Sequence, residues 1–127
     1  MKFTDITAER AVLAGLLQYG QEVAVEIGNI LSSQLFHDKS NQVIYACIAK
    51  CIENSSTVDM ASLLSAANSI GLYEEITKND QIEYLTGLRD YAINKENVKS
   101  HALKLYKLSI TKSLQYTLKN IAHNLDN

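Results

Sequence analysis

The segment "KENVKSHALKLYKLSITKSLQYTLKNIAHNLDN", residues 95–127, changes its apolar pattern along its length. Over residues 95–110, apolar side chains surround much of the expected helix. Beyond residue 110 they thin to a single line, which consists of Ile110, Leu114, Ile121 and Leu125, with Thr117 on the same line. A helix that is apolar on all sides is buried, whereas a helix with one apolar line needs one partner. The segment therefore predicts a long helix that begins inside a globular body and then projects from it.

Residues 1–94 show helical spacing of apolar residues with almost no strand-like alternation, and the chain has no proline. The expected helices cover residues 8–19, 22–31, 40–53, 60–70 and 81–92, with a short turn, "LYEEI", at 72–76. Together with the long helix they predict an all-α fold, a compact bundle of about six helices with a long, partly projecting C-terminal helix. We expect one domain in two parts, a globular helical body over residues 1–94 and the long helix over residues 95–127.

Cap residues mark several ends of these helices. Gly20 and Gly71 are expected to end the first and fourth helices in a left-handed conformation. The expected N-caps are Thr7, Asp59 or Thr57, and Asp80 with Glu83 in a D-x-x-E variant of the capping box. The loop "SSQLFHDKSNQ" is expected to insert Leu35 and Phe36 into the core.

The first expected helix lies within "AERAVLAGLLQYGQE", residues 8–22, and is rich in small residues. Gly15 falls inside its helical pattern, where a glycine costs about 1 kcal/mol relative to alanine. Such a cost is tolerated where two backbones cross closely. We therefore expect another helix to cross this one at short distance.

Length and composition fit one globular domain. The chain has 127 residues, of which 46% are hydrophobic and 20% charged, and this is enough to close a core without a metal or a disulfide. No apolar run reaches the roughly 18–20 residues that a bilayer span requires. The first ten residues, "MKFTDITAER", lack the apolar h-region of a secretory signal. We expect no membrane partner and a cytoplasmic location.

The sequence contains none of the common catalytic or nucleotide-binding motifs. A P-loop, G-x-S-x-G, H-E-x-x-H and C-x-x-C are all missing from it. His37, His101 and His123 are dispersed along the chain, and the adjacent Glu74 and Glu75 would diverge by about 100° on a helix. We expect no enzymatic activity, cofactor or metal in this chain.

Two cysteines, Cys47 and Cys51, lie four residues apart in "YACIAKCIE". On a helix this spacing places both on one face, but the parallel Cβ vectors fit disulfide geometry poorly. No further cysteine or histidine lies close by in sequence to complete a metal site. We expect two buried, reduced thiols, because a free cysteine behaves as a small hydrophobe.

The charge of the chain is unevenly spread. Residues 1–94 hold 6 basic and 12 acidic residues, whereas residues 95–127 hold 6 lysines against Glu96 and Asp126. This asymmetry fits either a surface for nucleic acid or an acidic partner, or a solvated helix face with its lysines toward water. Only two arginines are present, which argues against sequence-specific DNA recognition. The candidate basic face consists of Lys99, Lys104, Lys107, Lys112 and Lys119.

The order of these segments resembles the N-terminal domain of the replicative hexameric DNA helicases of the DnaB family. "AERAVLAGLL" is similar to the family's opening A-E-x-A-V-L-G-x-L-L phrase, and "LFHDKSNQVIYACI" to its Phe, short acidic turn and apolar helix. "TVDMASLLSAANSIGLYEEI", "IEYLTGL" and "NVKSHALKLYKLSITKSL" are similar to later segments of the family, in the same order. Lys39 and Thr57 stand where the family usually has prolines, and His101 replaces an aromatic residue. The chain looks like a divergent member, as a phage or mobile element would carry.

The resemblance implies a non-catalytic scaffold that mediates helicase oligomerisation and docks primase or a helicase loader, with DNA as an indirect partner. It implies a homo-oligomer, either a dimer or the hexamer of a full-length parent. Residues 95–127 are similar to the first arm of the family's helical hairpin, which a linker and a RecA-like motor follow. ATP and Mg²⁺ are therefore expected only in such a C-terminal motor domain. We expect a fragment of a helicase, the alternative being a free-standing small protein.

The residues expected to meet a second copy or another partner form the candidate interface, which consists of Leu103, Tyr106, Ile110, Leu114, Tyr116 and Ile121. Tyr84 and Tyr91 are candidates for a second, partner-facing patch. The alternative for each of these side chains is a place in the core of the chain's own fold. This alternative is strongest for Leu103 and Tyr84, and it also holds for the neighbouring Leu105. Two other functions stay open, a stand-alone helicase-binding regulator or inhibitor with the same fold, and a weak single-stranded DNA-binding module that uses the basic face.

Overall fold

The computed structural model describes residues 4–54 and 57–126. Within these residues it contains seven α-helices, one short 3-10 helix and no strand, which confirms the predicted all-α fold. The elements in chain order are α1 (Ile6–Tyr19), α2 (Gln21–Ile27), η1 (Ser33–Leu35), α3 (Lys39–Glu53), α4 (Met60–Ser69), α5 (Tyr73–Thr77), α6 (Gln81–Arg89) and α7 (Lys95–Asp126).

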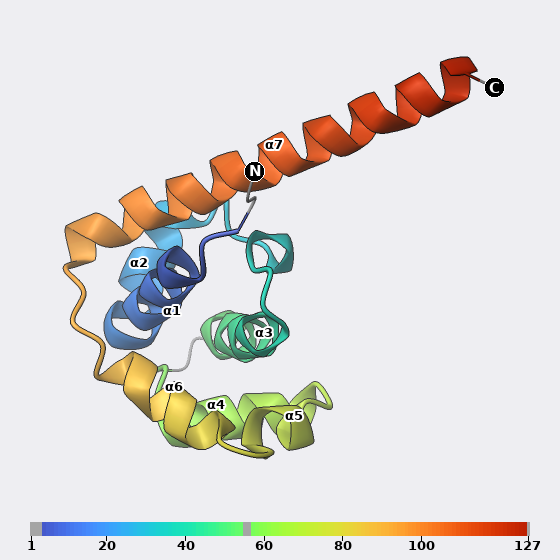
Figure 1. Ribbon diagram of the computed structural model, residues 1–127. Helices are drawn as coiled ribbons and strands as arrows, with labels where there is room; N and C mark the ends of the chain where they lie inside the picture. The colour runs from blue at the N-terminus through green and yellow to red at the C-terminus, as the bar shows by residue number, and fades with distance from the viewer. Residues whose placement is uncertain (1–3, 55–56, 127) are drawn as a thin grey trace.

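The helices of the body are stacked beneath the long α7. Figure 1 shows α7 crossing one end of the molecule, with α1, α2 and α3 below it and α4, α5 and α6 at the opposite end. α1 is the central helix, because it packs against α2, α3, α6 and α7. Apart from Arg10, every residue from Ala8 to Leu17 is buried. The segment with many small residues is therefore the main core element.

Gly15 sits where α1 and α7 cross. A Cβ atom built on Gly15 would lie 2.8 Å from Cγ1 of Val98 on α7, and closer still to its Cγ2. Cβ contacts this short essentially do not occur in proteins, so a larger residue would force the two helices apart. The close crossing predicted from the sequence is confirmed.

The loop between α2 and α3 closes the core as predicted. Leu35 and Phe36 are both buried, and the Phe36 ring stacks on Tyr45 of α3 with 5.2 Å between the ring centroids. Burial of two large apolar side chains fixes the loop on the body, since each contributes about 1.5–3 kcal/mol.

Of the five predicted caps, three are correct and two are wrong. The carboxylate of Asp59 accepts from Ser62 N–H at 2.7 Å, and Gly20 and Gly71 have φ of 60° and 77°. Asp5, rather than Thr7, caps α1, since its carboxylate accepts from Ala8 N–H at 2.9 Å and the helix already begins at Ile6. Asp80 makes no capping hydrogen bond. Its φ of −96° and ψ of 20° differ from the extended backbone that a capping side chain needs.

Several predicted boundaries shift by a few residues. α2 ends at Ile27 instead of residue 31, because the amides of Ile30 and Leu31 both turn back to the Ile27 carbonyl. α6 ends at Arg89 instead of residue 92, and the predicted turn at 72–76 overlaps the short helix α5, which ends at Thr77. The predicted break at 54–59 includes residues 55 and 56, which lie outside the described residues.

The two cysteines are free and buried, as predicted. Loss of hydration on burial raises the pKa of the Cys47 thiol from its ordinary value of 9.0 to about 11, and the pKa of Cys51 rises for the same reason. Because the folded-state pKa is raised, the stabilisation from the neutral Cys47 thiol is complete below pH 9.0 and is lost as the pH rises toward about 11.

We predict that neither native thiol reacts with Ellman's reagent in folded protein at pH 8, because the thiolate is the reacting form and both sulfurs are buried. In urea, both thiols should react within the mixing time. A Tyr116→Cys variant provides the exposed control, because Tyr116 is 68% exposed, and its added thiol should react at once in the folded protein. Rapid reaction of a native thiol in folded protein would contradict the buried geometry.

Candidate interaction surface

The α7 helix leaves the body part-way along its length. Val98, Ala102 and Leu105 are buried against the body, whereas every residue from Lys112 to Leu125 is exposed. At about 1.5 Å per residue this exposed part is roughly 20 Å long. Figure 1 shows it extending past the other helices. The predicted projection of the long helix is confirmed.

Most of the candidate interface lies on one side of α7. At about 100° per residue, Leu103, Tyr106, Ile110, Leu114 and Ile121 share the side away from Val98 and Leu105, and their exposed fractions run from 38% to 57%. Thr117 and the 81% exposed Leu125 continue the same line. We call this line the seam, and it consists of Leu103, Tyr106, Ile110, Leu114, Thr117, Ile121 and Leu125. Its exposed apolar side chains offer a continuous contact surface.

Tyr116 is exposed but does not belong to the seam. It follows Val98 by about five helical turns, so it lies on the body-facing side of α7, beyond the end of the body. Leu118, which is 56% exposed, lies at the edge of the seam instead. The positions of Tyr116 and Leu118 relative to the seam could be predicted from the sequence, because the angular position of a residue on a helix follows from its number.

Tyr84 and Tyr91 are not brought together into one patch. Tyr84 is half-buried and donates its hydroxyl to Oδ1 of Asn41, while the guanidinium of Arg10 lies 5.7 Å from the centre of its ring. Burial raises the pKa of Tyr84. Tyr91 lies beyond the end of α6, is 37% exposed, and its carbonyl accepts from Gln18. Tyr84 is thus engaged within the chain, and Tyr91 alone faces outward.

The five candidate lysines are spread around α7. Lys112 and Lys119 share one side, whereas Lys99 and Lys107 lie at the two edges of the seam. Lys104 forms an ion pair with Asp5, with 2.5 Å between Nζ and Oδ2, and this contact is the main reason that the pKa of Asp5 lies below its ordinary value. The structure therefore does not gather these lysines into a single basic face.

A buried polar network, which the sequence analysis missed, joins the helices beneath α7. Glu9 of α1 is 1% exposed. Its carboxylate accepts from the backbone N–H of His37 at 2.9 Å, from that of Asp38 at 3.3 Å, and from Nδ2 of Asn41 at 2.9 Å. Through Asn41 the network reaches Tyr84 of α6. The available signal was a single acidic residue between Ala8 and the apolar run that begins at Ala11.

Two clefts among the described residues lie beside η1 and between α2 and α3. The cleft beside η1, about 410 Å³ in volume, lies where α7 leaves the body and is lined by Leu105, Leu108 and Lys112 among others. The residues that line it include Glu9, whose carboxylate oxygens already accept hydrogen bonds from the chain. A mainly apolar groove of about 270 Å³ lies between α2 and α3.

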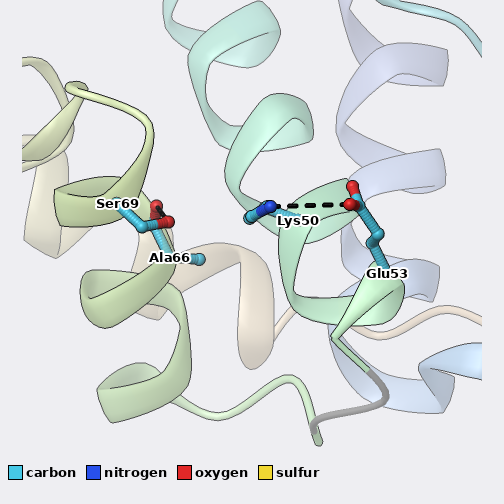
Figure 2. Close-up of polar contacts among 4 residues, drawn as sticks. All are labelled: Lys50, Glu53, Ala66 and Ser69. Carbon is cyan, nitrogen blue, oxygen red and sulfur yellow. Dashed lines mark hydrogen bonds and ion pairs between the residues drawn. The ribbon is translucent and has the colours of Figure 1, made fainter.

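A third cleft lies between α3 and α4. It is about 280 Å³ in volume and includes Cys51, Ala66 and Ser69. Figure 2 shows two polar contacts on the flanking helices: Lys50 lies 3.5 Å from Glu53 on α3, and Ser69 donates to the carbonyl of Ala66 at 2.8 Å on α4. Both contacts lie within a single helix.

Over residues 4–54 and 57–126, no group of three or more His, Cys, Asp or Glu side chains is arranged to hold a metal ion. Within the same part of the chain, no helix has the length and apolar character needed to cross a membrane.

Comparison with known proteins connects this geometry to a family. The family model of the DnaB-like helicase N terminal domain matches residues 1–107, and no curated protein matches the chain. The fold is similar to that of the N-terminal domain of DnaB helicase from Mycobacterium tuberculosis, with a TM-score of 0.79, 18% identity, and coverage of 94% of this chain and 83% of that chain. At this identity the likeness shows the shared fold alone. The family match covers most of the sequence, and the chain belongs to the DnaB-like helicase N-terminal domain family.

Proposed function

We propose that this chain is a non-catalytic scaffold domain of a replicative DNA helicase, which mediates helicase oligomerisation and docks primase or a helicase loader. Its family and its fold support a helicase-associated role. The single observation that carries the proposal is the seam, an apolar line along α7 that faces water for its whole length. Under this proposal the chain contacts DNA only through the assembly that it helps to form.

The seam has the physical character of an association surface. Burial of apolar surface contributes about 25 cal/mol for each Å² removed from water. The body does not need the seam, because α7 already contacts it through Val98, Ala102 and Leu105 on its other side. Removing apolar side chains from the seam should therefore weaken association without unfolding the body.

We predict that Ile110→Asp combined with Leu114→Asp weakens association roughly 100-fold, since two carboxylates would have to lose water at the interface. Sedimentation velocity should be measured for the chain alone and for its mixtures with the primase, the helicase loader and the replicative helicase of the same cells. Circular dichroism should show that the helical content of the variant is unchanged.

The matched control is Tyr116→Asp combined with Asn120→Asp. It adds the same two charges at the same spacing, but on a side of α7 away from the seam, and it should leave association unchanged. If the Ile110→Asp, Leu114→Asp variant unfolds, these side chains belong to the core and the proposal is wrong. It is equally wrong if the original chain binds neither itself nor any of these three partners.

A further inference from the structure

The mainly apolar groove between α2 and α3 is a second exposed surface, which the seam does not use. α2 packs on α1 and α7, whereas α3 packs on α1, α4 and α5, and the groove of about 270 Å³ lies between the two helices. Leu16 of α1, which is fully buried, lines the groove together with Ala24 of α2 and Ala49 of α3. Small side chains on both walls leave room for apolar groups that come from another molecule.

Val25 extends this apolar surface over the outer side of α2. At about 100° per residue, Val25 points away from Val23 and Ile27, the two buried residues of this helix, and it is 77% exposed. Ala24 and Gly28, four residues apart, line the groove beside it. We call the groove and Val25 together the α2–α3 surface. A helix placed along the groove would contact both parts of it.

Acidic side chains border the α2–α3 surface on both sides, and residues 11–38 contain no lysine or arginine. Glu26 is exposed and follows Val25 around α2, on the side away from the groove. Glu53 lines the groove from α3, with 71% of its side chain exposed. Its contact with Lys50, at 3.5 Å, is an exposed pair of low energy, so its carboxylate can also meet a cation from a partner.

These features fit the apolar face of a short helix that has basic residues on its flanks. The groove is smaller than the roughly 300–1,000 Å³ of sites that enclose a small-molecule ligand, whereas single apolar side chains of an amphipathic helix enter grooves of this kind. The flanks of such a helix would lie near Glu26 and Glu53. Lysine or arginine at these positions would meet opposite charges, and acidic flanks would meet like charges.

We propose that the α2–α3 surface docks a short amphipathic helix of a partner protein, whose apolar face is flanked by lysine or arginine. The inference rests on the proposed function, since it names the chemistry of one partner segment that the domain holds. The α2–α3 surface is separate from the seam, which lies on the side of α7 away from the body. The chain can therefore hold this helix while the seam is occupied.

Fluorescence anisotropy of the full chain with three labelled peptides tests the proposal. The first peptide is an amphipathic helix of leucine and lysine, about five turns long, the second has glutamate in place of lysine, and the third is a scrambled form of the first. At low salt the lysine peptide should bind about tenfold more tightly than the other two. Ala49→Leu, which fills the groove, should weaken its binding about tenfold, while urea denaturation shows that the variant is folded.

Charge reversal provides the sharper comparison. Glu26→Lys combined with Glu53→Lys should make the glutamate peptide bind about tenfold more tightly than the lysine peptide, because the borders of the surface are then basic. Glu74→Lys combined with Glu83→Lys is the matched control, since it makes the same change of charge on exposed residues of α5 and α6 and should leave the original preference. Each preference should shrink in about 1 M salt, where the Debye length is about 3 Å.

The outcomes separate this inference from the proposed function. Equal binding of the lysine and glutamate peptides, or a preference that charge reversal does not invert, would overturn the inference. Loss of self-association in Ala49→Leu would also overturn it, because the occupant would then be a second copy of this chain.

The seam variant, Ile110→Asp with Leu114→Asp, should bind the lysine peptide as the original chain does, and a loss of binding would place the peptide on the seam instead. A chain that associates through the seam but binds no peptide would leave the proposed function standing and remove only this inference. A chain that binds neither the peptide, nor itself, nor primase, loader or helicase would contradict both.

Discussion

Gly15→Val is expected to lower the free energy of unfolding by about 2–3 kcal/mol, the upper range for overpacking a closed core. The reason is the crossing of α1 and α7, where even a single added carbon at residue 15 would lie 2.8 Å from Cγ1 of Val98. Neither helix can move aside cheaply, because α1 also packs against α3 and α6. Urea denaturation followed by circular dichroism measures the loss.

Two controls make this result specific to the crossing. Gly87→Ala lies inside α6, where a Cβ would meet nothing within 4 Å, and it should raise stability by about 0.5–1 kcal/mol through helix propensity. Combining Gly15→Ala with Val98→Ala should cost less than the two single changes added together, because the second change removes the methyl groups that the first one meets. Strict additivity would show that the two residues do not contact each other.

Glu9→Ala is expected to cost about 3 kcal/mol, since it leaves one buried and two part-buried donors without an acceptor. These donors are the backbone amides of His37 and Asp38 and the side-chain amide of Asn41. The change should loosen the loop that carries Phe36 as well as the start of α3. Denaturation measures the energy, and faster hydrogen exchange at the amides of residues 37 and 38 would locate the effect.

Glu53→Ala provides the comparison for this second prediction. Its carboxylate lies on the surface with 71% of the side chain exposed, 3.5 Å from Lys50, and such exposed pairs contribute about 0–1 kcal/mol. Equal stabilities for the Glu9→Ala and Glu53→Ala variants would mean that the Glu9 network does not hold the loop.

Much of the fold follows from local patterns in the sequence. Helical periodicity and the lack of proline predict the helices, and the small residues around Gly15 predict a close crossing, because both effects act within a few residues. The start of α1 shows where such reasoning fails. Asp5 and Thr7 can both cap a helix, and the choice depends on which backbone is extended, which local spacing does not determine.

The candidate site was predictable in part. The apolar line on α7 and its projection follow from periodicity, whereas the role of Tyr84 depends on Asn41 and Arg10, which are far from it in sequence. Glu9 is a similar case, since its three donors come from residues 37–41. Long-range hydrogen bonds of this kind have no periodic signature, so only the folded chain reveals them.

The first turns of α7 are fastened to the body by two ion pairs, Lys95 with Glu22 and Lys104 with Asp5. The exposed end of α7 would therefore turn together with the base of the helix, about the point where the body holds it. A tilt of about 10° at the base would displace the tip by roughly 4 Å, given a rise of 1.5 Å per residue over the exposed length. A small rotation at the base of α7 would therefore move its tip much farther than its base.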